Sequence, residues 1–330
     1  MVADNNPILV RRNRGNELES IHRGCWAVVD VDGHVLASAG DPEQPIFPRS
    51  ASKSLQGLGT LDAGVERFAL GQEQLAVMIS SHNGEVIHEM AAGSLLTACG
   101  LDESALHCGE ATPFDDPKAE PRRIIHNCSG KHAGFLAGAV ALDQDPETYL
   151  DPEGAVQRRV QAAVVEMAAM GPGDWGLAVD GCSAPTFVMP LQALARGIAR
   201  VATPDDLPPE RARHCRLLTD AAFAHPELVA GVSPPRFDTE LMAASKGRLF
   251  AKGGADGMQV IGVMGAGIAF AGKVDDGNPR GLLPVAIEVL DRLGHVSDSV
   301  REGVREWTDP VIRNAAGLEV GEHRLEPFEV

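Results

Sequence analysis

Hydrophobic and polar positions along the N-terminal half of the chain separate one hairpin from a series of helices. Residues 24–40 (GCWAVVDVDGHVLASAG) predict a β-hairpin that turns at Asp32-Gly33. Residues 50–63 carry leucines at 55, 58 and 61 on one side of a predicted helix, although Gly57 and Gly59 interrupt it. Further helical patterns occupy residues 72–79, 85–98, 131–142, 152–169, 190–202 and 208–223.

The C-terminal part of the chain returns to strand patterns. Glycine-rich turns separate three predicted strands, two predicted helices follow, and the tail from Gly317 is predicted to be extended. The strands are 248–253, 258–264 and 267–274, and the helices are 282–293 and 297–306. Strands at both ends with helices between them predict an α+β fold, in which an antiparallel sheet built from N- and C-terminal strands has a helical region inserted between them. No repeat or low-complexity linker divides the chain, so residues 1–330 are predicted to form a single domain.

Composition limits the partners that the protein can have. The 330 residues are 44% hydrophobic, which is enough for a sizeable core, and the net charge of -17 argues against nucleic acids and anionic membranes. The first 25 residues contain one short apolar stretch, Pro7 to Val10, which is too short for the core of a signal peptide. We therefore expect a cytoplasmic protein with a small-molecule substrate. The six scattered cysteines are then expected to be free thiols or metal ligands.

Ser50 and Lys53 form a Ser-x-x-Lys motif at the start of a predicted helix. Residues three apart on a helix lie on nearly the same face, so the amine lies beside the hydroxyl. A lysine whose pKa is lowered by burial can take the proton of a serine and make it a nucleophile. A capping serine beside a solvated lysine would give the same spacing.

Two more segments add to this pattern. Residues 80–85 (SSHNGE) form a polar turn that brings together Ser81, Asn83 and Glu85, and residues 252–257 (KGGADG) end a predicted strand. After Lys252, glycines such as Gly254 let backbone N–H groups approach a ligand closely. Each segment alone is also compatible with an ordinary turn. Together the three read Ser-x-x-Lys, Ser-x-Asn and Lys-x-Gly, an order that resembles the signature motifs of class A β-lactamases and penicillin-binding proteins.

The resemblance is closest to the asparaginase II family, the inducible bacterial type. The stretches that carry it are 19–24 (ESIHRG), 48–53 (PRSASK), 81–85 (SHNGE), 128–132 (CSGKH) and 180–182 (DGC). It runs over nearly the whole chain, from about residue 8 to 328. The resemblance implies a β-lactamase-like fold shared with serine glutaminases, a homodimer, and hydrolysis of L-asparagine to aspartate and ammonia.

The family's functional residues match positions of this sequence. The resemblance implies that Ser50 and Ser81 are the candidate nucleophiles, with Lys53 and Lys252 as their partners. It also implies a zinc site beside the catalytic centre, whose ligands match Cys128, Lys131 and Cys182. Ligand preferences alone would instead choose Cys128, His126, His132 and Cys182.

A zwitterionic substrate needs one cationic and one anionic anchor. Arg49, next to Ser50, can form a fork with a carboxylate, or it can belong to a structural ion pair. Asp180 is the first candidate for the α-ammonium group, ahead of Glu85 and Asp256. Further candidates for direct contact with the substrate are Asn83 and Gly254.

The expected mechanism is acyl transfer. Lys53 deprotonates Ser50, Ser81 and Lys252 relay the proton to the leaving ammonia, and backbone N–H groups of Ser50 and of the loop 252–255 stabilise the oxyanion. The two Ser–Lys pairs leave open which serine attacks. Three other functions also remain open: a serine glutaminase, a β-lactamase or peptidase, and a non-catalytic zinc- or amino-acid-binding protein.

Overall fold

An eight-stranded sheet is formed by strands from both ends of the chain. The computed structural model describes residues 6–329. The strand order is β10-β11-β1-β2-β9-β8-β7, with β3 paired to β2, and every pairing is antiparallel. The strands are β1 (Ile8–Arg14), β2 (Glu17–Asp30), β3 (Val35–Ala39), β7 (Leu249–Gly254), β8 (Met258–Val263), β9 (Ile268–Val274), β10 (Val311–Arg313) and β11 (Glu319–Leu325). The predicted α+β class, with a sheet made from N- and C-terminal strands, is confirmed.

The long strand β2 joins the two parts of this sheet. Its first half pairs with β1, and its second half pairs with β9 on one side and β3 on the other. The predicted hairpin at Asp32-Gly33 is present between β2 and β3. The Asp30 carboxylate closes it by accepting the backbone N–H groups of Asp32, Gly33 and His34, and Gly33 has a φ of 97° that glycine adopts readily.

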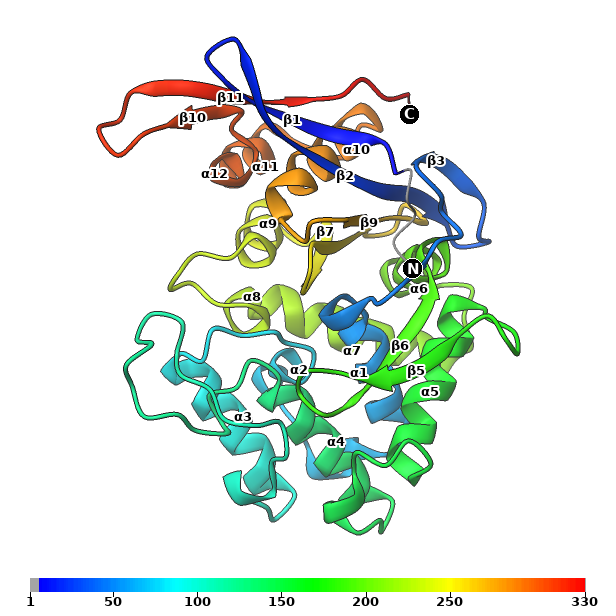
Figure 1. Cartoon of the computed structure of the whole chain (residues 1–330). Helices are drawn as coiled ribbons and strands as arrows, with labels where there is room; N and C mark the ends of the chain where they lie inside the picture. Colours follow the sequence, from blue (N-terminus) through cyan, green and yellow to red (C-terminus); the bar gives the residue numbers. More distant parts are fainter. Residues whose placement is uncertain (1–5, 330) are drawn as a thin grey trace.

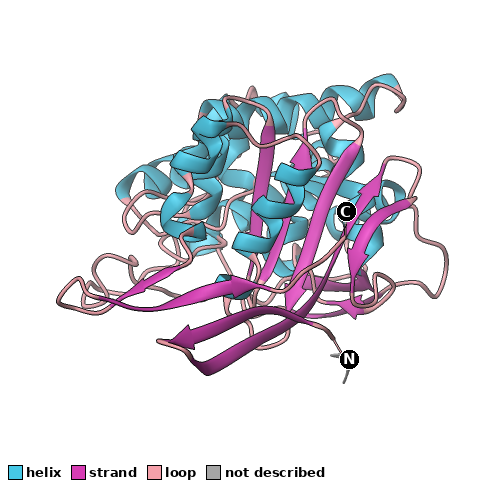
Figure 2. Ribbon diagram, turned by 90° about the horizontal axis from the view of Figure 1, so that it is seen from above, coloured by secondary structure: helices cyan, strands magenta, loops and turns pink. Residues whose placement is uncertain are grey.

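Helices fill the chain between β3 and β7 and also cover the sheet near the C-terminus (Figures 1 and 2). The α-helices are α1 (Lys53–Asp62), α2 (Gln72–Met78), α3 (Val86–Ala98), α4 (Ser129–Ala141), α5 (Ala155–Ala168), α6 (Leu191–Ala202), α7 (Pro209–Ala224), α8 (Pro226–Val229), α9 (Phe237–Ser245), α10 (Leu283–Arg292), α11 (Asp298–Gly303) and α12 (Arg305–Thr308). Helix α6 packs against β2, β8 and β9, whereas α10 contacts β9. No helix of residues 6–329 is both long and apolar enough to cross a membrane.

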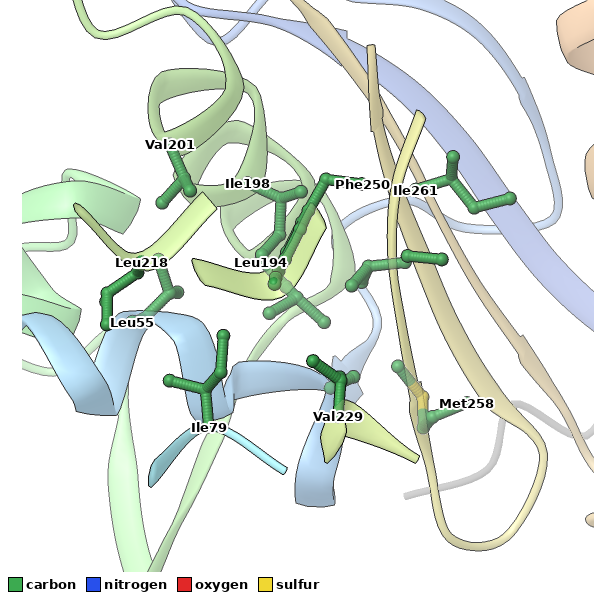
Figure 3. Close-up of a cluster of buried hydrophobic side chains, with 14 of the residues drawn as sticks. Leu55, Ile79, Leu194, Ile198, Val201, Leu218, Val229, Phe250, Met258 and Ile261 are labelled. Carbon is green, nitrogen blue, oxygen red and sulfur yellow. The ribbon is translucent and has the colours of Figure 1, made fainter. Parts of the chain in front are cut away.

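The hydrophobic core extends from the helical region to the sheet through α6 (Figure 3). Leu194 and Ile198 of α6 lie between Leu55 of α1 and the strand residues Phe250 and Ile261, and all five side chains are fully buried. Burial of such a side chain contributes roughly 1.5–3 kcal/mol relative to exposure. The core therefore holds α1, which carries the Ser-x-x-Lys motif, in a fixed position relative to β7, which carries Lys252.

The glycines of α1 allow close helix packing. A Cβ at Gly59 would overlap the backbone of Val160 in α5, and one at Gly57 would lie 2.6 Å from Ile79. The predicted helix over 50–63 is thus confirmed, with its first turn, Arg49–Ser52, in 3₁₀ form. The residues that weaken the helical pattern in the sequence are those that let α1 sit deep in the core.

Several elements are absent from the sequence prediction. They are β1, β10, α8, α9, and a second sheet of order β4-β6-β5, formed by β4 (Pro45–Ile46), β5 (Gly176–Val179) and β6 (Pro185–Pro190). The predicted helix over 297–306 is divided into α11 and α12. The segments β4, β5, β10 and α8 have two to four residues, too few for hydrophobic periodicity to be recognised, whereas β1 (ILVRRNR) is long enough but does not alternate apolar and polar residues.

Candidate active site

Ser50 lies in the 3₁₀ turn that leads into α1, and its side chain is nearly buried. The preceding residue, Arg49, has a φ of 50°. A left-handed backbone is unfavourable for a residue other than glycine and occurs often at functional sites. The turn itself rests on β7, because a Cβ at Gly254 would lie 2.7 Å from the carbonyl oxygen of Pro48 and 3.1 Å from the N atom of Ala51. Gly254 is predicted to let the backbone approach a ligand. In the structure its missing side chain allows close contact between β7 and the Ser50 turn.

Ser81 meets Ser50 from a separate segment. The residues after α2 run extended beside the end of α8, since the N–H groups of Ser81 and Asn83 donate to the carbonyl oxygens of Val229 and Ala230. The Ser81 hydroxyl donates a hydrogen bond of 3.1 Å to Ser50 Oγ. The Ser-x-x-Lys and Ser-x-Asn motifs are therefore brought together through their two serines.

Lys53 is buried, but its amine faces α4. Its Nζ donates to the carbonyl oxygen of Ser80 and, at 3.2 Å, to Cys128 Sγ. Burial lowers the pKa of Lys53 and outweighs the nearby Cys128 sulfur, which acts in the opposite direction. Over residues 6–329 no hydrogen bond joins this amine to Ser50 or Ser81, so the direct Ser50–Lys53 contact that the spacing predicts is not formed in this structure.

Lys252 lies on β7 with a fully buried side chain. Its Nζ donates to the carbonyl oxygen of Gly253 at 3.1 Å and lies 3.6 Å from Asp238 Oδ2. Burial lowers the pKa of Lys252 to about 8, although the Asp238 carboxylate opposes the shift. An amine with such a pKa is neutral in about a tenth of molecules at pH 7, and the neutral form can accept a proton.

Arg49 forms ion pairs within the protein. Its Nε donates to Asp180 Oδ1 at 2.9 Å, and its Nη1 contacts the Asp256 carboxylate. Of the two expectations for Arg49, the structure shows the ion pair. Asp180 and Asp256, expected as partners of a substrate ammonium group, are the carboxylates that neutralise this guanidinium.

Asn83 and Glu85 hold a loop. The Asn83 amide donates to the carbonyl oxygen of Pro234 at 2.8 Å and to Glu85 Oε1 at 3.1 Å. Its carbonyl oxygen accepts a hydrogen bond of 2.7 Å from Arg236 Nη1. Glu85 Oε1 also accepts the N–H groups of Val232 and Ser233. Both side chains, predicted to bind substrate directly, are thus bonded to the loop 231–236.

Two cysteines and a lysine meet at the start of α4. Lys131 Nζ lies 3.2 Å from Cys182 Sγ, and Cys128 lies between Lys53 and Lys131. A hydrogen bond with Cys182, together with the two amines, lowers the pKa of Cys128, so that Cys128 carries the thiolate of the pair. The three residues that the family resemblance selects are therefore gathered at one point.

The alternative ligand set is not gathered in the same way. His132 is fully buried, and its Nδ1 lies 2.7 Å from the hydroxyl oxygen of Tyr149. In the described part of the chain, the one group of three histidine, cysteine or acidic ligand atoms within 4.8 Å of one another is Asp30, Asp32 and His34, on the β2–β3 hairpin. The set of Cys128, His126, His132 and Cys182 is therefore a wrong choice for a single ion.

These segments enclose a cavity of about 410 Å³ between the sheet and the helical region. The site residues that line it are Arg49, Ser50, Ser81, Cys128, Asp180, Cys182, Arg236, Asp238, Gly254 and Ala255. Lys53, Lys131 and Lys252 lie behind this wall, with side chains almost inaccessible to solvent. The cavity thus offers two hydroxyls and a thiolate, supported by buried amines.

Sequence reasoning missed two charged residues of the cavity, Arg236 and Asp238. Asp238 is buried, and it accepts hydrogen bonds from Gly253 N at 2.7 Å and from the Gln259 side chain at 3.0 Å. Both residues lie at the start of α9, which the periodicity does not reveal. An arginine and an aspartate just after the Pro234-Pro235 pair are the single local signal for them.

Two serine hydroxyls in contact at a cavity wall that is backed by buried amines of lowered pKa are typical of a hydrolase with a hydroxyl nucleophile. Comparison with known protein families identifies the kind of hydrolase. The L-asparaginase II family model matches residues 10–325, and the chain belongs to this family of amidohydrolases. The predicted family is confirmed.

Solved structures give a more distant comparison. The chain is similar to a structure of Mglu in its native form in 4.3 M NaCl, with 15% identity and a TM-score of 0.45 over 84% of this chain and 62% of that one. A second native Mglu structure gives 14% identity and a TM-score of 0.44, over 82% and 64%. A β-lactamase from Mycobacterium bovis gives 16% and 0.44, over 86% and 95%. The chain spans less than two thirds of the length of these two Mglu chains, and no curated protein matches it.

Proposed function

We propose that this protein is an L-asparagine amidohydrolase, which converts asparagine and water to aspartate and ammonia through a serine nucleophile. The observation that carries the proposal is the 3.1 Å contact between Ser81 Oγ and Ser50 Oγ at the wall of the cavity. Membership of the L-asparaginase II family supports an amide as the substrate. We also propose a homodimer, which the family resemblance suggests, and a cytoplasmic location; sedimentation and fractionation of the native protein would test them.

The proposed reaction proceeds in two steps. Ser50 Oγ attacks the side-chain amide carbon of asparagine, an ester forms, and the C–N bond breaks as ammonia leaves with the proton that the serine has lost. Water then hydrolyses the ester, which releases aspartate and restores the hydroxyl. We propose that Ser81, which donates a hydrogen bond to Ser50, relays protons to and from the nucleophile.

A neutral lysine accepts the serine proton in this proposal. Lys53 remains the proposed base of Ser50, because it follows in the same turn and burial lowers its pKa. Its amine must leave the carbonyl oxygen of Ser80 to reach the hydroxyl, which four rotatable bonds permit. Lys252, with a pKa of about 8, is the proposed relay: its neutral amine accepts the proton through Ser81 and then passes it to the leaving ammonia.

Backbone N–H groups complete the proposed site. Each donor of an oxyanion hole contributes roughly 2.7–4 kcal/mol to the stability of the transition state. The N–H of Gly253 already donates to Asp238, which leaves Gly254 and Ala255 as the donors of this loop that line the cavity. We propose that one of them acts with the N–H of Ser50.

We also propose that Cys128, Lys131 and Cys182 hold zinc. The donor set fits the ion. Lys131 Nζ lies 3.2 Å from Cys182 Sγ, Cys128 is the thiolate of the two cysteines, and thiolates are strong zinc ligands. Bound zinc would supply a Lewis acid that positions the substrate. The protein side chains would keep the acid–base work, because burial lowers the pKa of both Lys53 and Lys252.

Ammonia release by the purified protein tests the proposed function. Asparagine, glutamine and a chromogenic β-lactam are assayed side by side, since one methylene in a pocket is worth about 1–3 kcal/mol in discrimination. Turnover of asparagine with the highest kcat/KM supports the proposal. Preference for glutamine would make the protein a glutaminase, and absence of turnover with bound amino acid would make it a binding protein.

A further inference from the structure

The loop that carries Arg236 is held by the Ser-His-Asn-Gly-Glu motif. Asn83 bonds to the loop 231–236 at two points, Pro234 and Arg236, and Glu85 Oε1 accepts two of its backbone N–H groups. Contact is so close that a Cβ at Gly231 would overlap the Asn83 amide. Two turns of the chain some 150 residues apart thus fix one arginine at the cavity.

Arg236 carries an unneutralised charge at this wall. Its Nη1 donates to the neutral carbonyl oxygen of Asn83, and its guanidinium lies 5.7 Å from the centre of the Phe114 ring. Within residues 6–329 it forms no ion pair, whereas Arg49 is bonded to two carboxylates. An anionic group of a ligand in the cavity would be repelled by the carboxylates paired with Arg49. At Arg236 the same group would meet N–H donors that no carboxylate of the protein occupies.

We propose that Arg236 binds the α-carboxylate of the amino-acid substrate, and that Asn83 is the positioning residue that aims its guanidinium into the cavity. This inference rests on the proposed function, and it deepens it by naming the group that selects an α-amino acid over a simple amide. The Asn of the Ser-x-Asn motif then acts on the substrate through Arg236.

A substrate without the carboxylate tests this assignment. 3-Aminopropanamide retains the amide and the amine of asparagine and lacks the α-carboxylate. Charge-assisted hydrogen bonds contribute about 1.5–3 kcal/mol, which corresponds to about 10- to 150-fold in affinity. We expect Arg236→Gln to lower kcat/KM for asparagine by that factor, mainly through KM, and to leave kcat/KM for 3-aminopropanamide within about twofold.

Three further variants separate binding from folding. Arg236→Lys retains the charge without the fork and should restore part of the loss. Arg216→Gln removes an exposed arginine that pairs with Asp205 far from the cavity and should change neither substrate. Asn83→Ala should reduce the preference for asparagine over 3-aminopropanamide, a ratio that general destabilisation does not alter. An equal loss on both substrates in Arg236→Gln would overturn the assignment.

Binding measurements keep the assignment separate from the proposed function. Calorimetric titration compares L-aspartate with β-alanine, its decarboxylated analogue, on the wild type and on Arg236→Gln. We expect aspartate to lose about 10- to 150-fold in affinity and β-alanine to be unaffected. If the wild type binds aspartate but releases no ammonia from any amide, the proposed function fails while the anchor stands. If Arg236→Gln binds aspartate as the wild type does, the anchor is wrong whatever the enzyme catalyses.

Discussion

Asp238 controls how much of Lys252 is neutral, and this gives a pH prediction with a defined sign. With a pKa of about 8, about a tenth of Lys252 is neutral at pH 7 and about nine tenths at pH 9. If a neutral Lys252 is needed for proton transfer, kcat/KM of the wild type should rise about tenfold between these values. The Asp238 carboxylate favours the protonated amine, so its removal should lower the pKa of Lys252 and move the rise to lower pH.

The size of this effect follows from the 3.6 Å between Lys252 Nζ and Asp238 Oδ2. Two unit charges at that separation interact by about 1 kcal/mol at the dielectric constant of water and by about 4.6 kcal/mol at an effective value of about 20. Since 1.36 kcal/mol corresponds to a factor of ten, the rise should move by about one to three pH units. Lys53 and Arg236 remain as positive neighbours of Lys252, and the Cys128 thiolate as a negative one.

The variant for this test is Asp238→Asn. Asparagine keeps an oxygen that can accept the Gly253 N–H, so the turn after β7 should persist. Ammonia release is measured from pH 5.5 to 10 at low substrate concentration, with Asp205→Asn, an exposed carboxylate paired with Arg216, as the control. A profile of Asp238→Asn that coincides with that of the wild type would refute the reasoning, because the amine that titrates would then not be Lys252.

The other predictions concern the nucleophile, the base, the metal and the loop. Ser50→Ala should abolish ammonia release with the fold retained by circular dichroism, and residual activity above a few per cent would make Ser81 the nucleophile. Lys53→Met should lower kcat by roughly 10²–10⁴-fold, and retention of full activity would exclude Lys53 as the base. Cys128→Ser should reduce zinc below one ion per subunit in metal analysis and raise KM more than it lowers kcat; wild-type protein without zinc would remove the site. Gly231→Ala should lower the free energy of unfolding by about 1–3 kcal/mol, because φ is 134° and a Cβ would overlap the Asn83 amide; an unchanged denaturation midpoint would show that the loop can relax.

Much of the fold could be predicted from the sequence, because it depends on local backbone geometry. The Asp32-Gly33 turn, the helical periodicity of α4 to α7 and the strand patterns of β7 to β9 each depend on contacts between residues close in the chain. The position of Lys53 one turn after Ser50 is of the same kind. Very short elements such as α8 carry too few periodic residues to be recognised, and their position depends on tertiary packing.

Contacts between distant segments decided what the site residues do. The sequence placed Arg49 beside Ser50, but Asp180 and Asp256, brought to it by other segments, neutralise its charge. Asn83 stands in a recognisable motif, yet its hydrogen bond to Arg236 spans 153 positions. A spacing fixes which side chains share a turn, whereas the partner of a charged group depends on which surfaces the core brings together. The sequence by itself therefore determined the candidate chemistry and the fold class, and the tertiary structure decided which charged groups are paired and brought Arg236 and Asp238 to the cavity wall.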